Sequence, residues 1–150
     1  MSDIAAQEFE TTAGTPKLPV VASLLALVGL ADSVYLTVHH FTSEPVPCSI
    51  VEGCETVLTS SYAEIAGIPL AAFGALAYFV AFSLAILTVF GNRSMWLLFG
   101  IQSFIMAAVS VYLIYLQGFV IGAFCQFCLI SAATSISLLI IYLASRYFAR

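Results

Sequence analysis

Residues 18–40 read LPVVASLLALVGLADSVYLTVHH, and this stretch decides the class of fold to which the chain belongs. It holds one acidic residue, Asp32, within a run long enough to cross the hydrocarbon core of a bilayer, which takes about 20 predominantly apolar residues. Three further runs of the same kind follow at residues 68–90, 95–116 and about 123–143. The sequence therefore predicts an all-α membrane protein, a bundle of four transmembrane helices.

The composition of the chain supports this reading. Hydrophobic residues make up 62% of the sequence and charged residues only 8%, against about 45–50% and about 25% in ordinary soluble domains. There is too little polar side chain to cover a water-facing surface, so lipid has to cover part of it. The net charge of −4 and the lack of any Lys/Arg cluster argue against nucleic acid as a partner.

The links between the runs predict how the helices are arranged. Residues 91–94 and 117–122 are short links, and short links make consecutive helices antiparallel. The one long connection, residues 41–67, separates the first two runs. We expect a single transmembrane domain over residues 18–145.

The basic residues predict the orientation of this domain. The chain contains four of them, Lys17, Arg93, Arg146 and Arg150. With four crossings all four fall on one side, which the positive-inside rule assigns to the cytoplasm. We therefore expect a multi-pass protein of the cell membrane with both termini in the cytoplasm. Residues 1–17, which are polar and acidic, are expected to form a disordered cytoplasmic tail, and residues 146–150 a second, short cytoplasmic tail.

The long extracytoplasmic loop contains a further helical pattern. Apolar and small residues recur at spacings of three and four over Glu55–Ala66, which predicts a short helix with one apolar face. Such a segment is too short to span the bilayer and is expected to lie at the interface, over the mouth of the bundle. Gly67 and Pro69 are expected to end this helix and begin the next.

Both pairs of cysteines fall on the extracytoplasmic side. Cys48 and Cys54 lie in the long loop, and Cys125 and Cys128 lie where the fourth run begins. That compartment permits disulfides. The four cysteines are therefore the candidate reactive residues.

The second pair forms a C-x-x-C motif, Cys125-Gln126-Phe127-Cys128, that opens a helix. Free N–H groups and the partial positive charge of a helix N-terminus favour a thiolate there, and the thiolate is the species that attacks a disulfide. We expect Cys125 to lie nearest to water and Cys128 about one turn deeper, an arrangement suited to a relay from water toward a lipid-soluble acceptor.

The first pair lies on a segment stiffened by Pro45 and Pro47 and loosened by Gly53. A mobile pair of this kind can face a soluble partner in one state and Cys125 in another. Two static disulfides and a four-thiolate zinc site are the alternatives. The C-x₅-C spacing is wider than zinc sites commonly use, so no metal is expected.

Taken together, these motifs resemble the vitamin K epoxide reductase family in its bacterial or archaeal branch. The resemblance is carried by GLADSVYL at residues 29–36, VLTSSYA at 57–63, GIPLA at 67–71 and FG at 73–74, with the C-x-x-C at the start of the last helix. It covers about residues 18–143.

The resemblance implies a four-helix bundle around a quinone of the menaquinone, ubiquinone or phylloquinone type. It implies that electrons pass from an extracytoplasmic thioredoxin-like protein of the DsbA kind to the loop pair, then to the C-x-x-C, and then to the quinone. By position, Cys48 would exchange with the partner, Cys54 with Cys125, and Cys128 would face the quinone. Ser60 matches a family serine that shapes the loop and the quinone site, and Asp32 matches a bacterial-type acidic position.

The sequence departs from the family pattern in two respects. Many bacterial members carry a fused thioredoxin-like domain after a fifth helix, whereas this chain stops at Arg150, so a separate partner is expected. The vertebrate Tyr and Asn positions near vitamin K correspond to Ala132 and Leu70. The resemblance therefore implies quinone reduction and disulfide formation rather than epoxide reduction.

Several alternatives stay open. A protein of the disulfide bond formation protein B type also has four helices and two cysteine pairs, but its C-x-x-C is expected in the first loop. A non-enzymatic membrane module with structural disulfides is the alternative outside the enzymes. Phe73 and Phe127 are the candidate ring contacts for a quinone, and Asp32 is a candidate either for a structural hydrogen bond or for a proton route to it.

Overall fold

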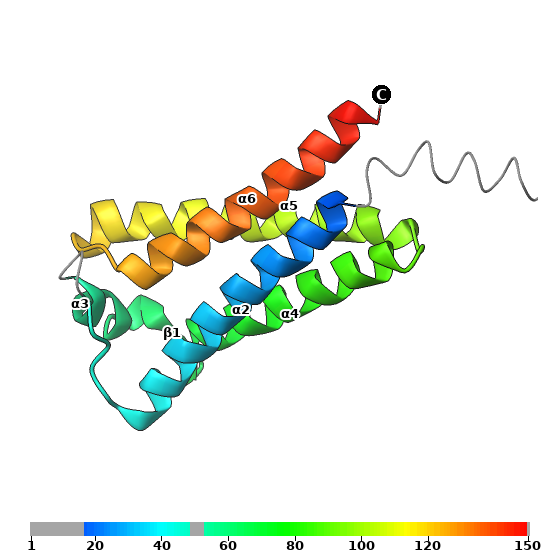
Figure 1. Cartoon of the computed structure of the whole chain (residues 1–150). Coiled ribbons are helices and arrows are strands. Elements are labelled where there is room, and N and C mark those ends of the chain that lie inside the picture. Colours follow the sequence, from blue (N-terminus) through cyan, green and yellow to red (C-terminus); the bar gives the residue numbers. More distant parts are fainter. Residues whose placement is uncertain (1–16, 49–52, 150) are drawn as a thin grey trace, which may run out of the picture.

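The computed structural model describes residues 17–48 and 53–149, and four long helices account for most of them (Figure 1). These are α2 (Lys17–Thr42), α4 (Leu70–Val89), α5 (Ser94–Tyr115) and α6 (Gln126–Phe148). The segment η2 (Leu116–Ile121) continues α5 as a π-helix. The predicted four-helix bundle is confirmed.

The four helices pack in a ring in which each contacts two neighbours. Helix α2 packs against α4 and α6, and α5 packs against the other sides of the same two helices. The interior holds small residues, including Ala22 and Ala26 of α2 and Ala81 and Ala85 of α4, all of them fully buried. Small residues allow helix backbones to approach closely where lipid offers no hydrophobic drive for association.

Tyr78 is the large residue that fills the space left by these small ones. A Cβ atom placed on Gly29 would lie 2.2 Å from the Tyr78 ring. Helices α2 and α4 can therefore approach closely at this point only because Gly29 has no side chain. The Tyr78 hydroxyl donates a hydrogen bond to the carbonyl oxygen of Ser131 at 2.5 Å. Tyr78 therefore connects three of the four helices.

The outer faces of the bundle are apolar. Exposed side chains include Leu24, Leu76, Phe104 and Ile140, each more than half exposed. All four helices, α5 together with its π-helical extension, are long and apolar enough to cross a membrane. The chain is therefore a multi-pass membrane protein whose exposed apolar side chains face lipid.

Figure 1 shows that the two ends of the bundle differ. The start of α2, the link between α4 and α5, and the end of α6 lie at one end. The small elements and the start of α6 lie at the other. Lys17, Arg93 and Arg146 are thus all at the end away from the cysteines. Which end faces the cytoplasm stays a prediction.

The loop helix is shorter than predicted. Helix α3 covers only Cys54–Leu58 and is followed by a 3₁₀ turn, η1 (Ser61–Ala63), and by two paired strands, β1 (Glu64–Ile65) and β2 (Ile68–Pro69). The predicted helix over residues 55–66 is therefore wrong in its extent. Hydroxyl groups explain the early end, because Thr59 and Ser60 donate to the carbonyl oxygens of Glu55 and Val57 and so compete with the helical hydrogen bonds.

Ala66 and Gly67 reverse the chain between the two strands. Both have positive φ, 54° and 81°, the combination found in tight two-residue hairpin turns. A helix cannot continue through two such residues.

The ends of the transmembrane helices also differ from the predicted ranges. Helix α6 begins at Gln126 rather than near residue 123, with Cys125 in an extended conformation just before it, and it continues to Phe148 through most of the predicted tail. The predicted link 117–122 is mostly the π-helical turn, which ends at Gly122 with φ of 74°. Of the predicted disordered tail, residues 1–17, only Lys17 is described, and it begins α2 instead. Residues 1–16 and the loop residues 49–52 lie outside the described residues.

The contact of Gly29 with Tyr78 yields a stability prediction. Gly29→Ala should lower the free energy of unfolding by about 1–3 kcal/mol, because the Tyr78 ring is held by Ser131 and cannot move aside without losing that hydrogen bond. Thermal unfolding in detergent measures the effect. Ala31→Val, on the exposed side of the same helix, is the control. Equal melting temperatures for the two variants would contradict this account of the packing.

Candidate functional site: two cysteine pairs beside an apolar cavity

The structure brings all four cysteines together at one end of the bundle. Cys48 and Cys54 form a disulfide with a Cα–Cα distance of 6.2 Å, and Cys125 and Cys128 are free thiols. Cys54 and Cys125, 1% and 0% exposed, share one buried cluster with Val57. Cys48 and Cys128 are partly exposed and pack against it.

Gly53 allows this meeting of the two pairs. A Cβ atom at Gly53 would lie 2.4 Å from the carbonyl oxygen and 2.8 Å from the nitrogen of Phe124. Any side chain at this position would push the loop away from the backbone that precedes Cys125. The glycine expected to loosen the loop is therefore a point of close backbone contact between the two cysteine segments.

Two polar contacts connect the loop to its surroundings. The backbone N–H of Val46 donates to Glu55 Oε1 at 2.9 Å, which joins the segment before Cys48 to helix α3. His40 Nε2 lies 2.7 Å from Glu64 Oε1, which joins the end of α2 to strand β1. The first contact fixes the shape of the loop, and the second attaches the loop to the end of α2.

Cys128 is partly exposed and lines the cavity. Cys125, which was expected to face water, is instead fully buried beneath the loop. The reason is the close packing of α3 and Gly53 on residues 123–125, which the position of Cys125 at a helix start does not reveal.

Gln117 holds the backbone at Cys125. Its side chain is 3% exposed, and its Oε1 accepts the N–H of Cys125 at 3.0 Å. The carbonyl oxygen of Gln117 accepts the N–H of Ala123 at 3.0 Å. One residue of the π-helical turn thus bonds to both ends of the segment that leads into the C-x-x-C. The sequence analysis places Gln117 only in the link between the third and fourth helices. A polar amide between two apolar runs is the signal that indicates a functional residue there.

The surroundings of Cys125 favour its thiolate. The hydrogen bond with the Cys128 side chain lowers the pKa of Cys125 to about 7, against the effect of burial, which raises it. The backbone N–H groups of Cys128 and Phe127, in the first turn of α6, lower the pKa further. The predicted effect of the helix start thus acts here together with the paired cysteine.

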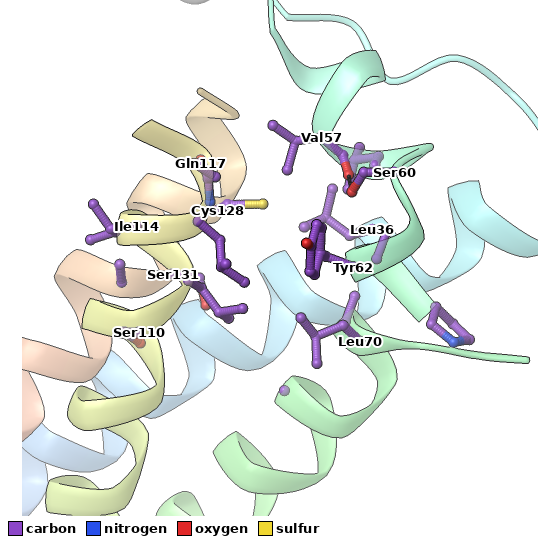
Figure 2. Close-up of a pocket in the computed structure, with 18 of the residues that line it drawn as sticks. Leu36, Val57, Ser60, Tyr62, Leu70, Ser110, Ile114, Gln117, Cys128 and Ser131 are labelled. Atoms are coloured by element: carbon purple, nitrogen blue, oxygen red, sulfur yellow. Dashed lines mark hydrogen bonds between the residues drawn. The ribbon is translucent and has the colours of Figure 1, made fainter. Parts of the chain in front are cut away.

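A cavity of about 140 Å³ opens beside the sulfurs. This is roughly ten times the space that one water molecule needs. Its lining is mostly apolar and includes Leu36, Val57, Leu58, Leu70, Ile114 and Leu116. Figure 2 shows the Cys128 sulfur projecting from the α6 side toward the wall formed by Leu36, Val57, Ser60 and Tyr62. The cavity therefore joins a reactive sulfur to a site suited to an apolar ring.

The proposed quinone contacts fall in different places. Ser60 and Cys128 line the cavity. Phe73 is 43% exposed and is not part of the lining.

Phe127 packs against the cysteine cluster, with its ring centroid 5.3 Å from that of Tyr35. Asp32 also lies outside the lining, and its Oδ2 is buried without a hydrogen-bond partner among the described residues.

The fold and the site together define a class, a four-helix membrane protein with two cysteine pairs meeting beside an apolar cavity. The chain belongs to the vitamin K epoxide reductase family, whose sequence model matches residues 20–143. It is similar to the thiol-disulfide oxidoreductase LTO1 of Arabidopsis thaliana, with 34% identity over 119 residues. That alignment covers 73% of this chain but only 31% of the plant protein.

The contact between Gly53 and Phe124 yields a prediction about how well the loop shields Cys125. Gly53→Ala should raise the alkylation rate of Cys125 severalfold at constant pH, because the added methyl group cannot fit against Phe124 and must displace the loop. Mass spectrometry of the Cys125 peptide measures the rate. Thr56→Val, on the exposed side of α3, is the control. An unchanged rate in Gly53→Ala would mean that this contact does not cover Cys125.

The lowered pKa of Cys125 yields a prediction about pH. With Cys128 present, alkylation of Cys125 should rise with pH and be half-maximal near pH 7, because the thiolate is the reacting form. Cys128→Ala removes the largest cause of the lowered pKa, so the midpoint should move to higher pH. The same midpoint in both proteins would show that the paired cysteine does not set the pKa.

Proposed function

We propose that this protein is a membrane thiol–disulfide oxidoreductase that oxidises an extracytoplasmic thioredoxin-like protein and passes the electrons to a membrane quinone, and so supports disulfide formation. The observation that carries the proposal is the chain of sulfurs, in which the loop disulfide packs on Cys125 while Cys128 lines the apolar cavity. Family membership and the similarity to a thiol-disulfide oxidoreductase support it.

The exposure of the cysteines suggests their order in the reaction. Cys48 is partly exposed and Cys54 is buried with Cys125, so a partner thiolate attacks Cys48 and releases Cys54. The second cysteine of the partner then displaces Cys48. The partner leaves with a new disulfide, and the loop pair is left as two reduced cysteines.

The loop pair then reduces the C-x-x-C. The Cys54 thiolate attacks Cys125 of an oxidised Cys125–Cys128 pair and releases Cys128. Cys48 next attacks Cys54 and releases Cys125. The products are a loop disulfide and a reduced C-x-x-C, which is the combination seen in the structure. The lowered pKa of Cys125 assists the last step, because a thiol of lower pKa is the better leaving group.

The cavity residues fit a quinone ring. Leu36, Leu70 and Ile114 supply apolar contacts that exclude water, and Cys128 presents its sulfur to the enclosed space. A bound quinone of the menaquinone, ubiquinone or phylloquinone type supplies an acceptor for the two electrons and two protons released when Cys125 and Cys128 form a disulfide.

The same lining favours quinone reduction over epoxide reduction. Ala132 and Leu70, which correspond to the vertebrate Tyr and Asn positions, both line the cavity and offer no side-chain hydrogen bond. Ser60 donates its hydroxyl to Val57 at 2.6 Å, so its part in this proposal is to shape the wall. Phe127 supports the sulfur cluster, and Phe73 and Asp32 have no ring contact in this scheme.

Electron transfer to a quinone tests the proposal. With a reduced thioredoxin-like protein as donor and menadione as acceptor, the purified protein should reduce menadione, and Cys128→Ser should lower the rate to that without protein. Ser137→Ala, which removes a local hydrogen bond on the same helix, should retain the activity. Full activity of Cys128→Ser would remove Cys128 from this role. An inactive parent protein would favour the non-enzymatic alternative.

Cross-linking tests the assignment of Cys54. In Cys48→Ser/Cys128→Ser only Cys54 and Cys125 remain, and mild oxidation should join them efficiently because both lie in one buried cluster. Cys54→Ser/Cys128→Ser leaves Cys48 and Cys125 and should cross-link poorly. Equal yields in the two double variants would contradict the proposed order.

A further inference from the structure

The polar residues in the lining of the cavity are Ser33, His40, Ser60, Tyr62, Ser110, Gln117, Cys128 and Ser131. Several already have protein partners. Ser60 donates to Val57, Ser110 bonds to Ser135 at 2.6 Å, and Ser131 contacts the Tyr78 hydroxyl at 3.0 Å. Gln117 differs from these, because only half of its amide is engaged.

The orientation of the Gln117 amide follows from its partner. The backbone N–H of Cys125 can only donate, so the side-chain oxygen of Gln117 must face it, as the 3.0 Å contact shows. The Nε2 group then points away from Cys125. It has no hydrogen-bond partner within the part of the chain that the structure describes, although the residue is 3% exposed and lines the cavity. Because Gln117 lines the cavity, this N–H group can donate to an oxygen atom of a ligand bound there.

Gln117 also lies on the reactive side of the cavity. Figure 2 shows Gln117 and Cys128 on the wall formed by η2 and α6, opposite Tyr62 and Leu70. Gln117 holds the backbone of Cys125, and Cys128 follows about one helical turn later. A group bound by this amide is therefore positioned relative to the same turn that carries the reactive sulfur.

We propose that Gln117 is a ring-binding and positioning residue, which donates its free N–H to a quinone carbonyl oxygen while its own carbonyl oxygen holds Cys125. The inference rests on the proposed function and adds to it the group that recognises the polar part of the acceptor. One side chain then sets the positions of both the ring and the C-x-x-C.

Ligand binding tests the first half of the proposal. Menadione and 2-methylnaphthalene have the same carbon skeleton, but only menadione has carbonyl oxygens. The parent protein should bind menadione more tightly, and Gln117→Met should lose about threefold to tenfold of that preference, as expected for one neutral hydrogen bond. Gln102→Met is the matched control, since Gln102 lies on α5 outside the cavity lining and contacts the Ala77 carbonyl oxygen at 3.4 Å.

Cysteine reactivity tests the second half, without turnover. Gln117→Met should change the alkylation rate of Cys125 and lower the yield of the Cys54–Cys125 cross-link in the Cys48→Ser/Cys128→Ser background, whereas Gln102→Met should change neither. If Gln117→Met does not fold, Gln117→Glu replaces it. That variant keeps an oxygen for Cys125 but has no N–H, so it should lose the preference for menadione and retain the cross-link.

The outcomes separate the two proposals. A parent protein that does not bind menadione would overturn the proposed function itself. If the parent protein binds menadione and both Gln117 variants keep its preference for menadione over 2-methylnaphthalene, Gln117 does not bind the ring. The proposed function would then still stand. An unaltered Cys125 reactivity in Gln117→Met would overturn the positioning role.

Discussion

Hydrocarbon cannot form hydrogen bonds with a peptide group, and this constraint organises the whole molecule. Within the bilayer the chain has to satisfy its backbone internally, so it forms four regular helices joined through small residues. Irregular backbone is confined to the ends of the bundle. The extended residue at Cys125, the π-helical turn and the short hairpin all lie at one end, and the four cysteines are there as well.

That end is built from backbone contacts rather than from large side chains. Gly53 lies against Phe124, Gln117 bonds to Cys125 and Ala123, and Glu55 bonds to Val46. These contacts fix the backbone around a buried cluster that contains Cys54, Val57 and Cys125. The two cysteine segments are therefore held together both by backbone contacts and by apolar packing.

The helical bundle was predictable because hydrophobic run length is a local property of the sequence, and the cysteine motifs were predictable because their spacing is local too. Features that depend on distant residues were missed. The burial of Cys125 results from packing with Cys54 and Val57, which are distant in sequence, and Gly53 allows their segment to approach Phe124. The early end of α3 results from hydroxyl groups that compete for its carbonyls. Phe73 is predicted as a ring contact from its residue type, but residue type does not determine the direction in which the side chain points.

The hydrogen bond from Tyr78 to Ser131 has a consequence for how the protein moves. This hydrogen bond links α6 to α4 about one turn further along α6 than Cys128. The Tyr78 ring also packs directly against the backbone of Gly29 in α2. A sliding, piston-like displacement of α6 along its axis would break this fastening in an environment that offers no replacement partner. This hydrogen bond therefore resists a change in the depth of Cys128, and a rearrangement at this end of the bundle falls to the loop above it.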